Sequence, residues 1–235
     1  MASGRTVARR AAYEVATTLS RYPAVASRAA RMWNIGTPVD DATDVVIEGF
    51  PRSGNTAVFA AFSVAQPSAI RIAHHTHTPA NAIAGVRRGL PVLVLIRAPD
   101  EAVREMMQIR PELTVRQAAR GYRRFYAPLL PFRDRIVVGR FDDVIVDLGA
   151  VIEQVNERFG SDFILPSASP GDPDAETIER RYWEDRAGRG LPVLGRSVGG
   201  RNGASRSEVD AVYDSPAFAS VRRELTSLYG EFAAP

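Results

Sequence analysis

The sequence predicts an α/β fold in which a mainly parallel central sheet is flanked by helices. Short apolar runs that stop at a glycine or a polar cluster alternate with longer segments of helical periodicity. The run Pro91–Ile96 (PVLVLI) is the most strand-like, and its continuous apolar character is typical of a strand buried on both faces. A length of 235 residues suits one α/β domain with a full core, so we treat residues 1–235 as a single domain.

The first expected element is one helix over residues 5–33, followed by a Gly/Pro/Asp-rich linker over residues 34–43. The apolar stripe of this helix consists of Val7, Ala11, Val15, Leu19, Tyr22, Val25, Ala29 and Met32. Residues 1–35 hold six arginines and one acid, so their formal charge is +5, whereas the other 200 residues carry −2.

Two roles fit such a helix. It packs across the domain with its stripe buried, or it lies on an anionic membrane surface. We favour packing, because the stripe is rich in alanine and has few large anchors.

Residues 44–165 are expected to form the core that carries the functional site. The expected strands are Asp44–Glu48, Ala69–Ala73, Pro91–Ile96 and Arg135–Val138. The expected helices are Asn55–Val64, Pro79–Arg88, one from Pro99, Val115–Leu130 and one from Leu148 to Phe159 that stops at Gly160.

Residues 166–235 are expected to form a helical C-terminal part. It begins with a loop over residues 166–173 and continues with a charged helix over 174–187 and a Gly-rich loop over 195–203. A closing helix follows, with Val221, Leu225, Leu228 and Tyr229 on one face.

Composition excludes several kinds of function. The chain has no cysteine, which excludes disulfides, thiolate chemistry and thiolate metal sites. All 30 basic residues are arginine, so every cationic contact comes from a planar guanidinium that suits phosphate or sulfate. The slightly acidic body argues against nucleic acid as a partner. Without a long apolar run or a signal peptide, we expect a cytoplasmic protein whose only candidate membrane contact is residues 5–33.

The segment Gly49–Thr56 (GFPRSGNT) lies between an expected strand and an expected helix. It matches the phosphate-binding pattern G-x-x-x-x-G-K-[ST] at Gly49, Gly54 and Thr56, but Asn55 replaces the lysine. Such a P-loop-like strand–loop–helix unit turns backbone N–H groups toward an anion. Because Arg52 is the only cation in the loop, the segment is poorly suited to ATP with Mg²⁺.

The stretch Pro51–Thr56 (PRSGNT) resembles the 5′-phosphosulfate loop, P-[KR]-S-G-[TN]-T, of sulfotransferases that use 3′-phosphoadenosine-5′-phosphosulfate (PAPS). The resemblance covers residues 44–163 and implies PAPS as the sulfuryl donor, without a metal. It implies Arg52 as a catalytic cation, and it implies donor binding by Pro51, Arg52, Ser53, Gly54, Asn55 and Thr56.

All three histidines lie together at His74, His75 and His77. The sequence Thr76–Pro79 (THTP) resembles the T-H-x-P segment that carries the catalytic base of this family, which implies that role for His77. A zinc site and a buried structural histidine remain the alternatives. On an extended segment, His75 and His77 would face one side and His74 the other.

A second anion site is implied by the segment Arg97–Glu101 (RAPDE). It resembles the family's R-x-P-x-[DE] segment, whose arginine binds the 3′-phosphate of the donor. The family usually has a serine eight residues later, where this chain has Glu105, so we expect Arg104 or a residue elsewhere to take over the contact.

Two further donor contacts are expected from weaker likenesses. The Gly-rich stretch over residues 196–203 resembles the donor-covering loop of the family, which makes Arg201 a candidate ligand of the donor. Ala57 replaces an aromatic residue that often stacks on the adenine, and Phe59 or Phe62 are candidate substitutes.

The leading hypothesis is sulfuryl transfer from PAPS to a hydroxyl or amine of a small-molecule, carbohydrate or lipid acceptor, with His77 as general base. One alternative is a P-loop-type kinase of a small alcohol, which would need Mg²⁺ and a lysine. The other is a catalytically inactive sulfotransferase-like binding protein, suggested by Glu105 and Ala57.

Overall fold

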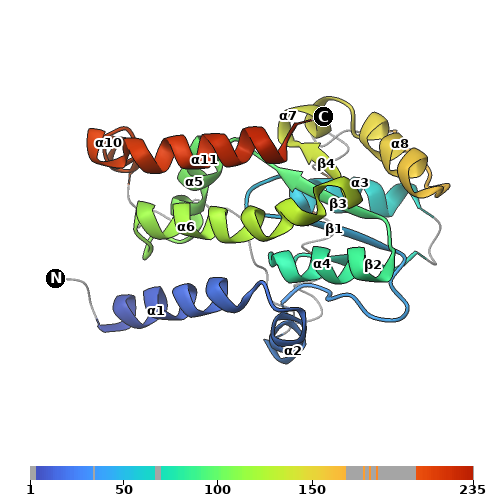
Figure 1. Cartoon of the computed structure of the whole chain (residues 1–235), viewed down its shortest axis with the longest axis horizontal. Coiled ribbons are helices and arrows are strands. Elements are labelled where there is room, and N and C mark those ends of the chain that lie inside the picture. The colour runs from blue at the N-terminus through green and yellow to red at the C-terminus, as the bar shows by residue number, and fades with distance from the viewer. Residues whose placement is uncertain are drawn as a thin grey trace.

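A four-stranded parallel sheet with the order β2–β1–β3–β4 forms the centre of the molecule (Figure 1). Its strands are β1 (Val45–Gly49), β2 (Ile72–His74), β3 (Val92–Ile96) and β4 (Val137–Arg140). The structure, a computed structural model, describes residues 4–33, 35–66, 70–167 and 205–234, together with residues 177, 180 and 184. The predicted α/β class, with a parallel sheet and flanking helices, is confirmed.

Helices surround the sheet on both faces. Those N-terminal to β4 are α1 (Gly4–Leu19), α2 (Pro23–Trp33), α3 (Asn55–Ala65), α4 (Pro79–Arg88), α5 (Pro99–Ile109), α6 (Val115–Tyr126) and the 3₁₀ helix η1 (Ala127–Arg135). Those after it are α7 (Phe141–Val146), α8 (Leu148–Phe159), α10 (Arg206–Tyr213), the 3₁₀ helix η2 (Pro216–Phe218) and α11 (Ala219–Phe232).

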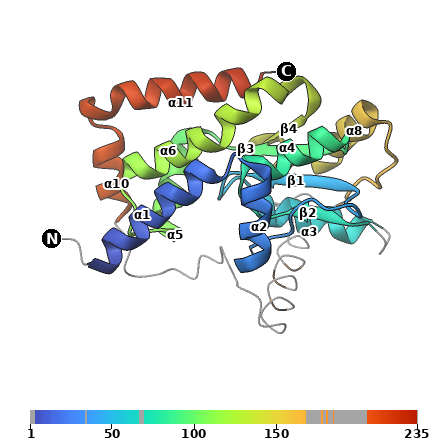
Figure 2. The ribbon, with the colours of Figure 1, turned by 60° about the horizontal axis from the view of Figure 1, so that its bottom comes forward.

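Alternating side chains of the central strands fill two separate cores. Val46 and Val94 pack against residues of α4, α5, α6 and α11 on one face. Ile47, Leu93 and Leu95 pack against α3 and α8 on the other. Because both faces are covered (Figure 2), β1 and β3 are buried along their whole length, as the continuous apolar sequence of β3 predicted.

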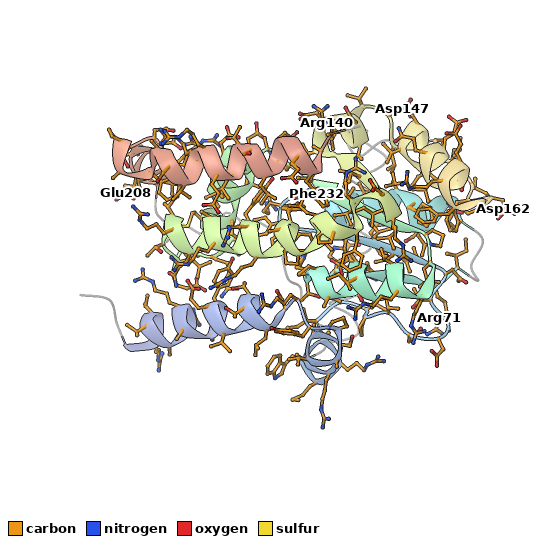
Figure 3. The ribbon with its side chains drawn as sticks, in the orientation of Figure 1. Arg71, Arg140, Asp147, Asp162, Glu208 and Phe232 are labelled. Carbon is orange, nitrogen blue, oxygen red and sulfur yellow. The ribbon has the colours of Figure 1, made fainter. Side chains whose placement is uncertain are left out.

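The closing helix α11 seals the first of these cores. It buries Leu225 and Leu228, as the helical spacing predicted, and Val221 and Tyr229 of the same predicted face are partly buried. Phe232, which was not predicted, is also buried. Figure 3 shows Phe232 turned inward from the end of α11, and its ring lies 5.2 Å from that of Tyr126 on α6. The first core therefore extends from α11 to Tyr126 of α6.

Proline breaks two helices that the sequence predicted as continuous. The expected helix 5–33 is two helices, α1 and α2, because Pro23 disfavours helical backbone at the residue before it. The expected helix 115–130 ends at Tyr126 and continues as the 3₁₀ helix η1, because Pro128 and Pro131 cannot donate the required hydrogen bonds.

The described part of the expected linker, residues 35–43, contains no helix and is attached to the body. Thr37 pairs with His74 through two backbone hydrogen bonds of 2.7 and 3.0 Å. Val39 is buried, and its N–H donates to the side chain of Asn81. The N-terminal helices are therefore anchored beside the histidine segment.

Candidate functional site

The two segments singled out by the sequence meet at the carboxyl edge of the sheet. β1 and β2 are parallel neighbours, with Ile47 paired to His74. The loop over residues 50–54 and the segment over residues 75–78 therefore leave the sheet side by side. The carboxyl edge is where open α/β sheets bind ligands.

Tyr126 of α6 holds the loop that follows β1. Its hydroxyl accepts a hydrogen bond from the N–H of Phe50 and donates one to the carbonyl of Leu95, at 3.3 and 2.8 Å. It also contacts the hydroxyl of Ser53, which is fully buried. Burial raises the pKa of Tyr126, so the hydroxyl remains a donor. This role was not predictable from the sequence, because tyrosine in an amphipathic helix usually indicates packing.

Replacing Tyr126 with phenylalanine should lower the free energy of unfolding by about 1–3 kcal/mol. The change removes one oxygen and leaves the buried N–H of Phe50 and carbonyl of Leu95 without this partner. Denaturant unfolding of Tyr126→Phe measures the loss. The exposed Tyr22→Phe is the matched control and should change stability by less than about 0.5 kcal/mol. Equal effects in both variants would contradict the anchoring role.

The loop ends at Gly54, directly before α3. Gly54 has left-handed backbone, with φ +88°, and a Cβ there would lie 3.3 Å from the ring of Phe141. The backbone conformation and this close contact both favour glycine at position 54. No side chain caps α3, and the first N–H groups of a helix have no acceptor within it. The N-terminus of α3 is thus available to an anion.

Asn55, which replaces the lysine of the phosphate-binding pattern, is used inside the loop. Its side-chain amide donates to the carbonyl of Phe50 at 2.9 Å, and its buried Oδ1 has no hydrogen-bond partner. Oδ1 also lies against Gly49, where a Cβ would come within 2.7 Å of it. Asn55 can therefore offer an anion its backbone N–H but not its side chain.

The histidine segment is not extended, and the prediction that His74 faces away from His75 is wrong. His75 and His77 have left-handed backbone, with φ of +57° and +51°. The turn brings the Nδ1 atoms of His74 and His75 to 2.6 Å from each other. Because only one proton fits between two such nitrogens, at least one of the two rings has an unprotonated Nδ1.

His75 joins this segment to the loop. Its Nε2 lies 3.0 Å from the hydroxyl of Thr56, in the first turn of α3. His74 stacks on Phe59 with ring centroids 3.8 Å apart, and Phe62 is fully buried in the second core. Phe62 is therefore excluded as an adenine-stacking residue, and one face of Phe59 is covered by His74.

His77 is held with one ring nitrogen facing the backbone. Its Nδ1 lies 2.9 Å from the carbonyl oxygen of Gly49, and a carbonyl can only accept, so Nδ1 carries the proton. In the neutral ring, Nε2 then has a lone pair. The side chain is half-buried at the carboxyl edge of β1. This arrangement is suited to a general base.

Glu48 is a buried residue that the sequence analysis missed. Its fully buried carboxylate accepts hydrogen bonds from the N–H and hydroxyl of Thr76, the N–H of His77 and the amide of Asn81, at 2.7–3.1 Å. Burial raises the pKa of Glu48, while His77 and the donors from Thr76 and Asn81 act in the opposite direction. An acidic residue at the end of an otherwise apolar strand could have indicated a functional role for Glu48.

Backbone strain is concentrated at this site. Arg52, His75 and His77 are the non-glycine residues with positive φ in the described part of the chain, and all three lie in the two segments. A left-handed non-glycine residue costs about 1–3 kcal/mol and persists only where its surroundings fix it. For His77, the hydrogen bonds to Glu48 and Gly49 provide that constraint.

Arg52 and Arg97 lie next to each other at the loop. Arg52 forms a salt bridge of 3.0 Å with Glu105 of α5, which the sequence did not predict. Arg97 follows β3, donates to the backbone carbonyl of Arg52 at 3.4 Å, and pairs with Glu101. Its guanidinium also lies 4.2 Å from the ring centre of Phe141. Both cations are thus near the N-terminus of α3, and each has a carboxylate partner.

Arg104 is engaged elsewhere. Its guanidinium pairs with Asp210 and Asp214 and lies over the ring of Tyr213, all in or next to α10. In this arrangement it links α5 to α10 and does not contact the loop. Arg201 lies outside the described residues, as do most of the expected helix 174–187 and all of the expected loop 195–203.

Within the described ranges, no three His, Asp or Glu side chains form a group that could hold a metal. No described helix is long and apolar enough to cross a membrane. A hollow of about 370 Å³ lies at the opposite edge of the sheet, near Leu90, Arg135 and Phe159, and includes none of the residues discussed above. No protein-family model matches the chain, and no curated protein is significantly similar to it.

Proposed function

We propose that the chain is a PAPS-dependent sulfotransferase that acts on a hydroxyl or amine of a small-molecule, carbohydrate or lipid acceptor. The observation that carries the proposal is the contact between the loop and the histidine segment. The hydroxyl of Thr56 contacts Nε2 of His75, and Nδ1 of His77 contacts the carbonyl oxygen of Gly49. The candidate anion site at the N-terminus of α3 and the candidate base His77 are therefore next to each other. The resemblance of both segments to the family supports assigning them to donor and acceptor chemistry.

Donor binding is assigned to the N-terminus of α3 and the cations beside it. The N–H groups of residues 54–56 and the hydroxyl of Thr56 would hold the 5′-phosphate, because unsatisfied N–H groups and the helix dipole favour an anion there. Pro51 and Ser53 shape the loop, and Ser53 uses its own N–H to bond Phe50. Arg97 would bind the 3′-phosphate, and Arg201 stays a prediction for the same donor.

The reaction assigned to this site is an in-line displacement at sulfur. Nε2 of His77 takes the proton of the acceptor hydroxyl, and the acceptor oxygen forms a bond to sulfur. The bond from sulfur to the bridging phosphate oxygen breaks, and its electron pair leaves on adenosine 3′,5′-bisphosphate. Arg52 would neutralise the charge on that oxygen, as fixed cations do in phosphoryl transfer.

The ion pair between Arg52 and Glu105 favours a second candidate, a sulfotransferase-like protein that binds the donor without turnover. A carboxylate on the candidate catalytic cation competes with the developing charge and repels an incoming phosphate. The kinase alternative finds no comparable support, since the chain has no lysine.

Replacing Glu105 with glutamine should tighten the binding of adenosine 3′,5′-bisphosphate about tenfold, equivalent to about 1.4 kcal/mol. The change keeps the size of the side chain and removes the charge that opposes the phosphates. Titration calorimetry measures the affinity, and Glu224→Gln, which loses an exposed ion pair with Arg123 instead, should leave it unchanged. Weaker binding by Glu105→Gln would mean that Glu105 helps to build the site.

One titration tests the proposed function directly. Adenosine 3′,5′-bisphosphate should bind the full chain and release heat, whereas ATP with Mg²⁺ should bind much more weakly. The opposite order would favour the kinase and overturn the proposal. Binding of the bisphosphate without sulfuryl transfer from PAPS to any of a panel of phenols, sugars and amphiphilic alcohols would favour the inactive binding protein.

A further inference from the structure

The N-terminal helices dock on the body through few of their residues and leave most of their large apolar side chains exposed. The buried residues are Tyr13 of α1 and Ala26 and Ala30 of α2. Glu14 pairs with Arg120 and Arg124 of α6 at 2.5 Å. Burial works to raise the pKa of Glu14, but hydrogen bonds from the two arginines outweigh it and keep the pKa below its usual range.

The apolar stripe consequently faces solvent, and the expectation that packing buries it is wrong. We define the N-terminal apolar face as the exposed residues Val7, Val15, Leu19, Tyr22, Val25, Met32 and Trp33. These are seven of the twelve large hydrophobic residues exposed in the described part of the chain. Val15 is 58% exposed, Met32 66% and Trp33 61%. Figures 1 and 2 show α1 and α2 together on one side of the molecule.

Basic residues accompany this face. Arg5 and Arg9 of α1, Arg28 and Arg31 of α2, and Arg21 of the turn between them are all exposed. The single acid of this segment, Glu14, is neutralised by its ion pairs with α6. An exposed apolar stripe flanked by arginines, with tyrosine and tryptophan at its edge, has the composition of helices that lie in the interface of a membrane.

We propose that the N-terminal apolar face docks α1 and α2 on an anionic lipid surface. The charge of this face favours an anionic lipid surface over a second copy of the chain. A second copy of the chain would bring five arginines against five across a two-fold interface, which opposes association. Anionic headgroups attract the same arginines, and each basic residue near such a surface strengthens binding about fivefold. Acyl chains would cover the apolar residues.

This surface adjoins the histidine segment. The carbonyl of Ser20, between α1 and α2, accepts a hydrogen bond of 3.1 Å from Ala80, three residues after His77. Gly36 approaches the backbone of His75 so closely that a Cβ would lie 2.3 Å from it. If the proposed sulfuryl transfer holds, the acceptor is therefore an amphiphile in the same bilayer. The docking itself does not depend on that function.

Flotation with lipid vesicles tests the docking with the full chain. Removing residues before Thr43 would also remove the pairing of Thr37 and the buried Val39, so substitutions are the better perturbation. The wild-type chain should float with vesicles of phosphatidylcholine and phosphatidylglycerol at low salt, and poorly with phosphatidylcholine alone. Added salt should weaken binding, because it screens the arginines.

Two variants separate the apolar and charged contributions. The variant Val15→Ser, Val25→Ser, Trp33→Ser should lower the vesicle partition coefficient at least tenfold, and the variant Arg28→Gln, Arg31→Gln should lower it about 25-fold. The matched controls on α10 and α11, Val212→Ser and Arg223→Gln, should float like the wild type. Thermal unfolding checks that all variants fold. Absence of wild-type flotation, or flotation that the serine variant retains, overturns the proposal, as does dimerisation through this face detected by light scattering.

Flotation tests the membrane docking and turnover tests the proposed function, so each proposal can be contradicted without the other. A chain that floats but transfers no sulfuryl group to an amphiphilic alcohol contradicts the acceptor and leaves the docking intact. A chain that sulfates water-soluble alcohols without floating contradicts the docking and leaves the proposed function intact.

Discussion

Replacing His77 with asparagine is expected to lower the rate of sulfuryl transfer by about 10²–10⁴-fold, the usual cost of removing a general base. Asparagine is the informative substitution because residue 77 has φ +51°, and asparagine tolerates left-handed backbone better than alanine. The N–H of residue 77 can then still bond to Glu48. The variant removes the base while the local backbone is kept.

Two measurements separate this effect from a loss of structure. Binding of adenosine 3′,5′-bisphosphate should stay within about twofold of the wild type, because the residues assigned to the donor are untouched. The thermal unfolding midpoint should shift by only a few degrees. Near-normal turnover by the asparagine variant with every active acceptor would remove His77 from the mechanism and shift attention to His75, which contacts Thr56.

The elements that local chemistry determines were predictable from the sequence. The helix over Pro79–Arg88 was predicted with the observed bounds, because proline begins it and Gly89, with φ +73°, ends it. The strand β2 begins three residues later and ends one residue later than predicted, and β4 begins and ends two residues later. Strand bounds depend on pairing with a neighbour, as when Val137 pairs with Leu93, and an apolar run does not show where pairing begins.

The direction in which the N-terminal helices face was not predictable. An amphipathic stripe normally marks the buried side of a helix. Here Glu14 and Tyr13 provide the attachment to α6, and the more apolar side is left exposed. Which side of α1 attaches to the body depends on Arg120 and Arg124, which lie on a helix about a hundred residues later. A pattern within residues 5–33 cannot show it.

The residues that hold the site were the least predictable part. Motif spacing identified which residues are present at the loop and the histidine segment, and their contact through Thr56 and His75 follows from the parallel pairing of β1 and β2. The ion pair of Arg52 with Glu105, the buried Glu48 and the hydroxyl of Tyr126 are long-range contacts. The contacts of Glu105 and Tyr126 depend on how α5 and α6 pack on the sheet, and those of Glu48 depend on the turn after β2 and on Asn81 of α4.

Two replacements of Arg52 should lose the same activity but differ in stability. Its replacement by alanine or glycine is expected to lower turnover about 10²–10³-fold, as loss of one preorganised group at a developing oxyanion does. The residue has φ +72°, which costs a side chain with a Cβ about 1–2 kcal/mol relative to glycine. The glycine variant should therefore be about 1 kcal/mol more stable than the alanine variant, with both equally inactive.

The difference in stability between these two variants measures the cost of left-handed backbone at residue 52, because both variants leave Glu105 without its partner. Repeating it with glutamine at position 105 removes the remaining unpaired charge and should raise the stability of both variants by the same amount. Denaturant unfolding and turnover with PAPS are the two measurements. Turnover that survives in both variants would dismiss Arg52 as the catalytic cation. Equal stability of glycine and alanine would show that the left-handed backbone at residue 52 is not strained, and the concentration of strain at this site would then rest on His75 and His77 alone.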